Sequence, residues 1–387
     1  MNPVQALAEL VAFPTVSDRP VTAIAAWLAE RAEDAGMRVE RFETSPGKCN
    51  VVASAGPQGS DGVLLSGHMD VVPVEGQAWS RDPFRLAECD GRLYGRGACD
   101  MKAFLAAVTC ALPRLPLRAL RRELVLAWTH DEEVGCHGSR ALVDQLSAEG
   151  RTLPGLALIG EPTDFRILRA HAGHTTMRIH CQGVPAHSSR PQLGASAITM
   201  AAQVLAGLER LQERLARTRP EGVDPLILDA LPCPWPVLNC GHVHGGTAVN
   251  VIAEHCELLV GARQLPGQEG QDMLRLVAGV CEEVAADWAD RGGRVALVPM
   301  HEAPALLTPA GTALEALLRP HAADPRLGAA PFATDGGNLA RAGVQSLVFG
   351  PGSIDVAHRP DEYVPADQLL ACGEVVLDVV RARCLEG

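Results

Sequence analysis

Four short and almost uniformly apolar runs constrain the fold of this chain more than any other feature. They are NVVA at 50–53, VLLS at 63–66, ELVLAWT at 123–129 and LALI at 156–159. Runs without polar alternation are typical of strands that are buried on both faces, as in a parallel sheet covered by helices. Helical patterns separate them, including the apolar run KAFLAAVTCAL at 102–112. The first part of the chain therefore predicts an α/β domain.

The pattern changes near residue 170, where HTTMRIHCQG at 174–183 alternates like a half-exposed antiparallel strand. Five patterns follow this strand: a helix at 194–216, strands at 237–244 and 256–262, a helix at 270–290 and a strand at 294–300. With the first strand, they have the order β-α-β-β-α-β. That order predicts a small α+β, ferredoxin-like sandwich with its helices on one face. The α/β pattern then resumes, with a helix near 310–318, the strand SLVFG and a final helix from residue 366.

These patterns predict two domains, one inserted into the other. Residues 1–170 and 301–387 form the outer domain, with a mixed, largely parallel sheet and helices on both faces. Residues 171–300 form the inserted α+β domain.

Composition excludes several functional classes. The net charge of −12 disfavours binding to nucleic acid or to an anionic membrane. No uncharged apolar stretch approaches the roughly 18 residues that span a bilayer, and no signal peptide precedes the first helix, so we expect a cytoplasmic protein. The 12 cysteines are scattered without a C-x-x-C pair, which favours reduced thiols over zinc ligands.

Metal-ligand side chains recur at the ends of the apolar strands or in the loops that follow. They are His68 and Asp70 in SGHMD, Asp100 in GRGACDMK, Glu132 and Glu133 in THDEEVGCHG, Glu161 in LALIGEPT, and His358 in DVAHRPDE. Any one of them alone is typical of a helix cap or a surface group. Several carboxylates at one edge of a sheet would repel one another unless a cation neutralised them.

The spacing of these residues indicates different roles. Histidine nitrogens and carboxylate oxygens suit zinc, and a shared carboxylate can bridge two ions. Asp70 is spaced to accept the other ring N–H of a metal-bound His68. Neighbouring side chains in extended backbone point to opposite sides, so one of Glu132 and Glu133 can bind metal while the other faces a metal-bound water. Such an arrangement predicts a hydrolase.

In this order, these five motifs resemble the M20 family of dinuclear zinc amidohydrolases and exopeptidases, over nearly the whole chain. The resemblance implies two Zn²⁺ ions, for which Co²⁺ can substitute, with Asp100 bridging them. The implied metal ligands are His68, Asp100, Glu133, Glu161 and His358. It also implies that Glu132 is the general base, that Asp70 orients His68, and that the Asp100–Met101 peptide is cis. The inserted domain corresponds to the family's lid and dimerisation domain, so a homodimer is expected.

Within the family, the motifs GRGACDMK, DEEVGC and GPGSIDVAHRPDEYV resemble those of the acetylornithine deacetylases, which act in arginine biosynthesis. The resemblance implies release of acetate and L-ornithine from N-acetyl-L-ornithine. Another N-acyl-amino-acid deacylase, a succinyl-diaminopimelate desuccinylase, a metallo-dipeptidase and a non-catalytic binding protein are the alternatives. The resemblance places His171 at substrate recognition, and this chain departs from the group at the next residue, Ala172, where a lysine often stands.

The resemblance also implies residues that contact the substrate. His187 in GVPAHSSRP would reach the neighbouring subunit's site and bind the developing oxyanion. Asn250 in GGTAVNVIAE and Arg263 in GARQLPG would lie near the substrate carboxylate, where a guanidinium can pair two oxygens. Gly352 in GPG would let the backbone approach the substrate. The Gly-Gly pair at 245–246 is not a phosphate loop, because no Gly-Lys-Ser/Thr follows it.

Overall fold

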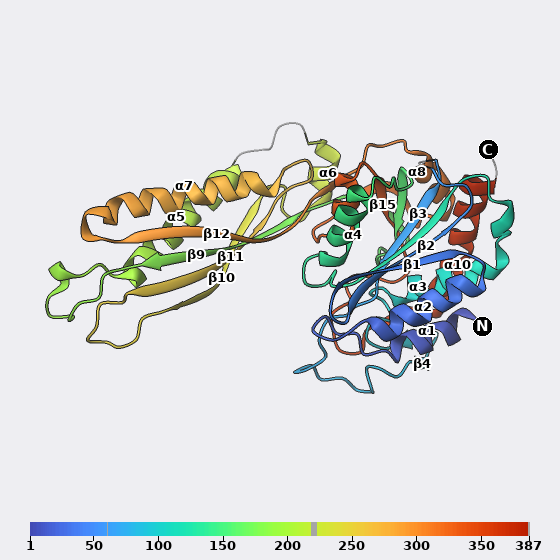
Figure 1. Ribbon diagram of the computed structural model, residues 1–387, viewed down its shortest axis with the longest axis horizontal. Coiled ribbons are helices and arrows are strands. Elements are labelled where there is room, and N and C mark those ends of the chain that lie inside the picture. The colour runs from blue at the N-terminus through green and yellow to red at the C-terminus, as the bar shows by residue number, and fades with distance from the viewer. Residues whose placement is uncertain (60, 218–222, 386–387) are drawn as a thin grey trace. The chain divides into compact units, whose positions relative to one another are not determined.

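A computed structural model describes residues 1–59, 61–217 and 223–385. The chain divides into two compact units (Figure 1). Unit 1 comprises residues 1–170, 306–328 and 334–387, and unit 2 comprises residues 171–305 and 329–333. Among the described residues, no helix combines the length and the apolar character needed to cross a membrane.

The main sheet of unit 1 has nine strands within the described residues, in the order β1-β2-β6-β3-β7-β15-β8-β13, with β14 paired to β8. The strands are β1 (Arg38–Ser45), β2 (Lys48–Ala55), β3 (Val63–His68), β6 (Leu124–Thr129), β7 (Leu156–Ile159), β8 (Arg166–His171), β13 (Leu306–Leu307), β14 (Asp324–Ala330) and β15 (Gln345–Val348). The central strands β6, β3, β7 and β15 are parallel, whereas β1, β2 and β8 pair antiparallel at the flanks. The predicted mixed, largely parallel sheet is therefore confirmed.

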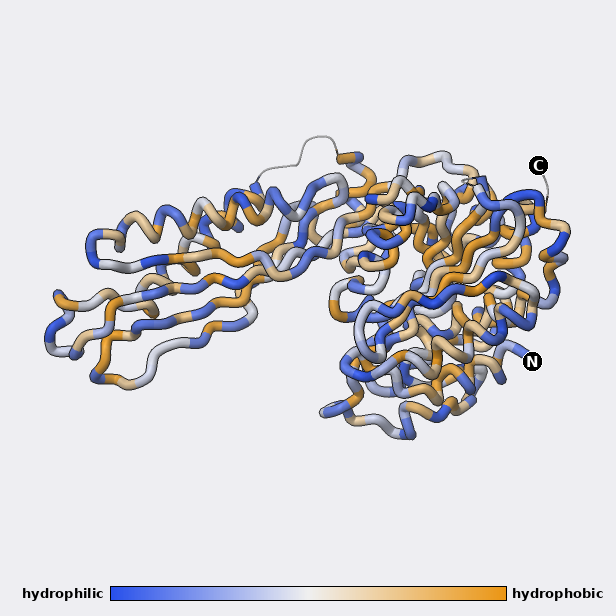
Figure 2. Tube along the Cα trace, in the orientation of Figure 1, coloured by the Kyte–Doolittle hydropathy of each residue, from blue (hydrophilic) through white to orange (hydrophobic). Residues whose placement is uncertain are grey.

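Helices cover both faces of this sheet. They are α1 (Pro3–Val11), α2 (Thr22–Asp34), α3 (Lys102–Ala111), α4 (His137–Ala148), α8 (Ala313–Leu318), α9 (Gly336–Arg341) and α10 (Ala366–Val380). On β2, Val51 and Ala53 pack into the core that contains α1, α2, α3 and α10. Val52 and Ser54 point the other way and line a small cavity with Leu146 of α4. Figure 2 shows hydrophobic residues concentrated along these strands, as burial on both faces requires.

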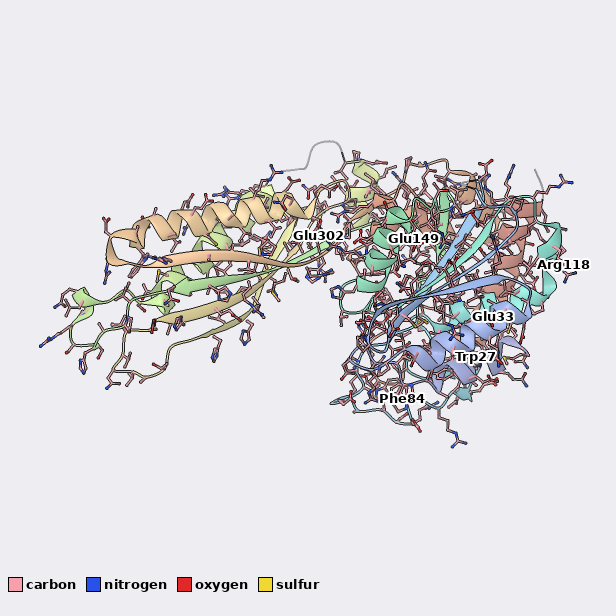
Figure 3. All side chains as sticks on the ribbon, in the orientation of Figure 1. Trp27, Glu33, Phe84, Arg118, Glu149 and Glu302 are labelled. Carbon is pink, nitrogen blue, oxygen red and sulfur yellow. The ribbon has the colours of Figure 1, made fainter. Side chains whose placement is uncertain are left out.

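Local contacts fix the first helices of unit 1. Asn2 caps α1, because its side chain accepts a hydrogen bond from the backbone N–H of Gln5. Trp27 of α2, labelled in Figure 3, donates its indole N–H to Glu9 of α1 at 2.7 Å. A small sheet, β16-β5-β4, completes the unit with β4 (Ala87–Cys89), β5 (Arg92–Tyr94) and β16 (Tyr363–Pro365).

Unit 2 contains an antiparallel sheet in the order β10-β11-β9-β12. Its elements are β9 (His174–Gln182), α5 (Ala197–Arg217), α6 (Pro225–Ala230), β10 (Val237–Gly245), β11 (His255–Arg263), α7 (Gly270–Trp288) and β12 (Arg294–Ala303). Alternate residues of β9 and β11, such as Ile179 and Leu258, pack against α5 and α7 in one core. Apart from the short α6, the order is the predicted β-α-β-β-α-β.

Candidate metal and catalytic site

The candidate site lies at the carboxyl edge of the four parallel strands of unit 1. His68 is the last residue of β3, Glu132 and Glu133 follow β6, and Glu161 follows β7. Because parallel strands end at the same edge, their following residues converge there, as in other open α/β sheets. The chain order of the motifs thus becomes a spatial cluster.

Asp100 lies between two histidines that come from distant parts of the chain. His68 Nε2 is 3.0 Å from Asp100 Oδ1, and His358 Nε2 is 3.2 Å from Asp100 Oδ2. Each carboxylate oxygen of Asp100 therefore faces a different imidazole, which is the arrangement that a bridging carboxylate requires. The Asp100–Met101 peptide bond is cis, as the resemblance implied.

A further carboxylate accompanies each histidine. Glu161 Oε1 is 3.8 Å from His68 Nε2, and Glu133 Oε2 is 3.0 Å from His358 Nε2. In each of two groups of three side chains, one ligand atom per residue lies within 4.8 Å of the others. The first group is His68, Asp100 and Glu133, and the second is His68, Glu132 and Glu161.

The charges of these residues raise or lower one another's pKa values. Burial and then the Asp100 charge raise the pKa of Glu133 to about 7, and they raise that of Glu161 well above its usual range. Burial also raises the pKa of Glu132 well above its usual range, against the opposing charge of His68. Hydrogen bonds with Asp100 and Glu133 raise the pKa of His358 to about 10.

These shifts have one physical origin, which is a buried group of carboxylates whose charges the two histidines offset only in part. Divalent cations would replace the protons that the group otherwise holds. Imidazole nitrogen and carboxylate oxygen are a donor set that suits zinc and cobalt, so the residues present fit such ions.

Asp70 has a different contact from the predicted one. The ring Nδ1 of His68 is 2.9 Å from the backbone carbonyl of Asp70, whereas the nearest side-chain oxygen is 3.7 Å away. The carboxylate instead accepts hydrogen bonds from the backbone N–H groups of Glu132 at 3.1 Å and Glu133 at 3.3 Å. It therefore satisfies two partly buried N–H groups of the turn after β6. The backbone carbonyl of Asp70, rather than its side chain, lies against the His68 ring.

The turn before Glu132 is also held from the other side. Asp131 has a φ of +53°, a left-handed conformation that is uncommon outside glycine. Its carboxylate forms a 2.6 Å ion pair with Lys48, and both side chains are only 14% exposed. This ion pair stabilises the left-handed backbone at Asp131, which directly precedes Glu132 and Glu133.

The predicted substrate residues of unit 2 lie at two different ends of its sheet. His187 and Asn250 lie together in unit 2, where His187 bridges to Val251 and the N–H of Ser188 donates to the Asn250 carbonyl at 3.0 Å. Arg263 ends β11 and lies at the other end of the sheet, roughly 26 Å from His255 at the start of this nine-residue strand.

His171 belongs to the end of unit 2 that contains Arg263, because it precedes the start of β9 and β9 runs antiparallel to β11. Gly352 lies in unit 1 with a φ of +82°, a conformation that favours glycine.

Three further residues lie near the site. Asp335 is 2% exposed and accepts a hydrogen bond from Thr129, the last residue of β6. The thiol of Cys136 lies 3.5 Å from Glu132 Oε1. Glu362 accepts hydrogen bonds from the backbone around Asp100. The DE of HRPDEY was the available sequence signal for Glu362, and Cys136 lies within the motif DEEVGC, whereas no local pattern indicates Asp335.

Comparison with known proteins agrees with this geometry. Residues 64–382 match the model of peptidase family M20/M25/M40. The chain is 33% identical to the acetylornithine deacetylase of Edwardsiella ictaluri (strain 93-146), over 97% of this chain and 96% of the relative.

Solved structures share the fold at low identity. A tripeptidase from Staphylococcus aureus has a TM-score of 0.76 at 20% identity, covering 98% of this chain and 97% of its own. A dinuclear metal-binding peptidase of the M20 family from Bacillus subtilis has a TM-score of 0.67 at 15% identity, covering 98% and 97%. The family match and the sequence relative together show that this chain belongs to peptidase family M20/M25/M40 and is a hydrolase.

Proposed function

We propose that this chain hydrolyses the amide bond of N-acetyl-L-ornithine to acetate and L-ornithine, a reaction of arginine biosynthesis. The observation that carries the proposal is the position of Asp100, which offers one carboxylate oxygen toward each of His68 and His358. The 33% identity to an acetylornithine deacetylase over 97% of the chain supports the choice of substrate.

The centre would hold two Zn²⁺ ions, and Co²⁺ is expected to substitute. His68 and Glu161 would bind one ion, His358 and Glu133 would bind the other, and Asp100 would bridge them. When bound, the ions supply Lewis acidity, which polarises the acyl carbonyl and makes water a better nucleophile.

Glu132 remains as the proton carrier of the site. Its carboxylate would accept the proton of the attacking water and later deliver it to the departing amine. Burial raises its pKa well above the usual range, which favours a proton on this carboxylate. Asp70 supports this role, because it holds the backbone N–H of Glu132.

We further propose that unit 1 is the catalytic domain and that unit 2 is the lid and dimerisation domain of a homodimer. Arg263 would pair with the substrate carboxylate, and His171 at the same end of unit 2 would also contact the substrate. Because Asn250 lies at the opposite end of the unit 2 sheet, it would act with His187 in the site of a second copy. There His187 would donate a hydrogen bond to the oxyanion.

The decisive experiment compares initial rates on a matched substrate panel, with Zn²⁺ or Co²⁺ and again after chelation. The panel contains N-acetyl-L-ornithine, N-acetyl-L-citrulline, N-acetyl-L-methionine, N-succinyl-diaminopimelate and a dipeptide. We expect the highest kcat/KM with N-acetyl-L-ornithine and loss of that activity on chelation.

Each other outcome has a defined meaning. A preference for another N-acyl amino acid would keep the proposed centre but overturn the substrate, and would direct attention to Ala172. A requirement for a free α-amine would identify a dipeptidase. No metal-dependent hydrolysis of any panel member would overturn the proposed function.

A further inference from the structure

A buried arginine lies between the two loops that carry Asp100 and His358. Arg96 follows β5, and its side chain is 1% exposed. Its Nη1 donates to Glu362 Oε2 at 2.5 Å, and its Nη2 donates to Gln77 Oε1 at 2.6 Å. The guanidinium also lies 5.0 Å from the centre of the Trp79 ring. Arg96 therefore joins two separate side chains in fixed directions.

The Glu362 side of this arrangement leads to Asp100. Glu362 Oε2 faces Arg96, while Oε1 accepts the backbone N–H groups of Cys99 at 2.9 Å and Asp100 at 3.0 Å. The Glu362 side chain is also 1% exposed, so water does not compete for these bonds. The position of the Asp100 main chain is thus fixed relative to the guanidinium.

The Gln77 side leads to His358. Gln77 Nε2 donates to the carbonyl of His358 at 3.0 Å, and Arg96 Nη1 is 3.4 Å from the carbonyl of Arg359. His358 has a φ of +62°, a left-handed conformation that needs support from its surroundings. The Trp79 indole donates to the same Gln77 oxygen at 3.0 Å, which fixes the orientation of the amide.

We propose that Arg96 is a positioning residue that sets the separation between Asp100 and His358, acting through Glu362 on one side and Gln77 on the other. This inference rests on the proposed function, because it concerns residues assigned there to the metal ions. Arg96 would act through Glu362 and Gln77 rather than by contact with substrate or ion. It fixes the main-chain segments that carry Asp100, the proposed bridging ligand, and His358, the proposed terminal ligand.

The geometry requires arginine rather than any cation. A guanidinium presents several N–H donors in a rigid planar fork, whereas an ammonium is a point charge on a flexible stem. Arg96→Lys therefore keeps the charge but loses the simultaneous hold on Glu362 and Gln77. Contacts of this kind around a metal site typically change metal affinity about 10–100-fold.

The test measures Zn²⁺ binding by the full-length, metal-free chain, in competition with a chromophoric chelator. Gln77→Ala removes the side chain that connects Arg96 to His358 and leaves the buried Arg96–Glu362 pair in place. The matched control is Gln145→Ala on α4, where the side chain bonds only to Glu149 among the contacts described for it. Thermal unfolding of each metal-free variant verifies that the fold is kept.

We expect Gln77→Ala to weaken one of two Zn²⁺ binding steps about tenfold, and Gln145→Ala to change neither step. In a His358→Ala background, which should retain one ion, Gln77→Ala should have no further effect. At saturating Zn²⁺, kcat of Gln77→Ala should recover to near the wild-type value, which general structural damage would not allow. Arg96→Lys should weaken both binding steps.

Two results would overturn different parts of the account. If the wild-type chain binds two ions and Gln77→Ala and Arg96→Lys bind them with unchanged affinity, the positioning role is wrong and the proposed function stands. If the wild-type chain binds no divalent metal, the proposed function itself fails, and the positioning role fails with it.

Discussion

The carboxylate of Asp70 accepts the backbone N–H of Glu132 at 3.1 Å, although 62 residues separate the two in the chain. The same carboxylate accepts the N–H of Glu133 and the hydroxyl of Ser17, the latter at 2.9 Å. Asp70 is fully buried, and the three bonds are partly shielded from water. One side chain after β3 thus fixes the turn that carries both the proposed base and a proposed metal ligand.

Asp70→Asn should lower kcat/KM about 10–100-fold while the chain still binds metal. The amide replaces one acceptor oxygen with a donor, which then faces a backbone N–H or the Ser17 hydroxyl, so the turn shifts. Steady-state kinetics and metal analysis of the purified variant measure both quantities. Ser17→Ala is the control, because it removes only the hydroxyl contact and should have a smaller effect. Unchanged kinetics in Asp70→Asn would refute this role.

Glu132→Ala should keep both metal ions and lose about 10²–10⁴-fold in kcat, the usual loss when a general acid–base group is removed. Glu133→Ala is its matched partner and should lose metal instead, because Glu133 pairs with His358 at 3.0 Å. Metal content per chain and kcat separate the two variants. Loss of metal from Glu132→Ala with retention in Glu133→Ala would show that the roles are reversed.

Acidification should destabilise unit 2 through His171. Burial lowers the pKa of this fully buried ring to about 4, from an ordinary value near 6.5. Between these values the unfolded chain binds a proton that the folded chain excludes, so stability falls as pH falls from 6.5 to 4, by about 3 kcal/mol at most. Denaturant unfolding at several pH values should give a shallower pH dependence for His171→Asn. An identical pH dependence in both proteins would contradict the assignment.

Two inactive variants should restore activity when mixed, if His187 serves the site of a second copy. In a mixed dimer of Glu132→Ala and His187→Ala chains, one site combines an intact Glu132 with an intact His187 from the other chain. Random exchange in equal amounts should give about a quarter of wild-type activity, because half of the dimers are mixed and each has one intact site. Activity no higher than that of the separate variants would place both residues in a site built from one chain.

The sequence predicts the architecture of unit 1 because its central strands are locally distinctive. Six consecutive residues of β3, from Val63 to His68, are buried, and the apolar run VLLS had indicated a strand covered on both faces. In contrast, β14 reads DPRLGAA, with a proline, a glycine and two charges. Its pairing with β8 arises from tertiary contacts rather than from propensity, so no local pattern indicates it.

The candidate site was predictable in its residue types and less so in its contacts. His68 and Asp70 stand two positions apart, which indicated a side-chain hydrogen bond, but the backbone carbonyl of Asp70 occupies that position. The carboxylate instead accepts the backbone N–H of Glu132, 62 residues further along the chain. Similarly, the bond between Arg96 and Glu362 spans 266 residues. Contacts at such separations depend on the assembled sheet edge, which no short pattern encodes.

Activity measured against added metal tests the central claim most directly. The metal-free full-length chain is titrated with Zn²⁺, and the initial rate of N-acetyl-L-ornithine hydrolysis is recorded at each ratio of metal to chain. We expect no hydrolysis without metal and a rate that stops rising at about two ions per chain, one for each histidine paired with Asp100. Full activity in the metal-free chain, with no response to Zn²⁺, would contradict that claim.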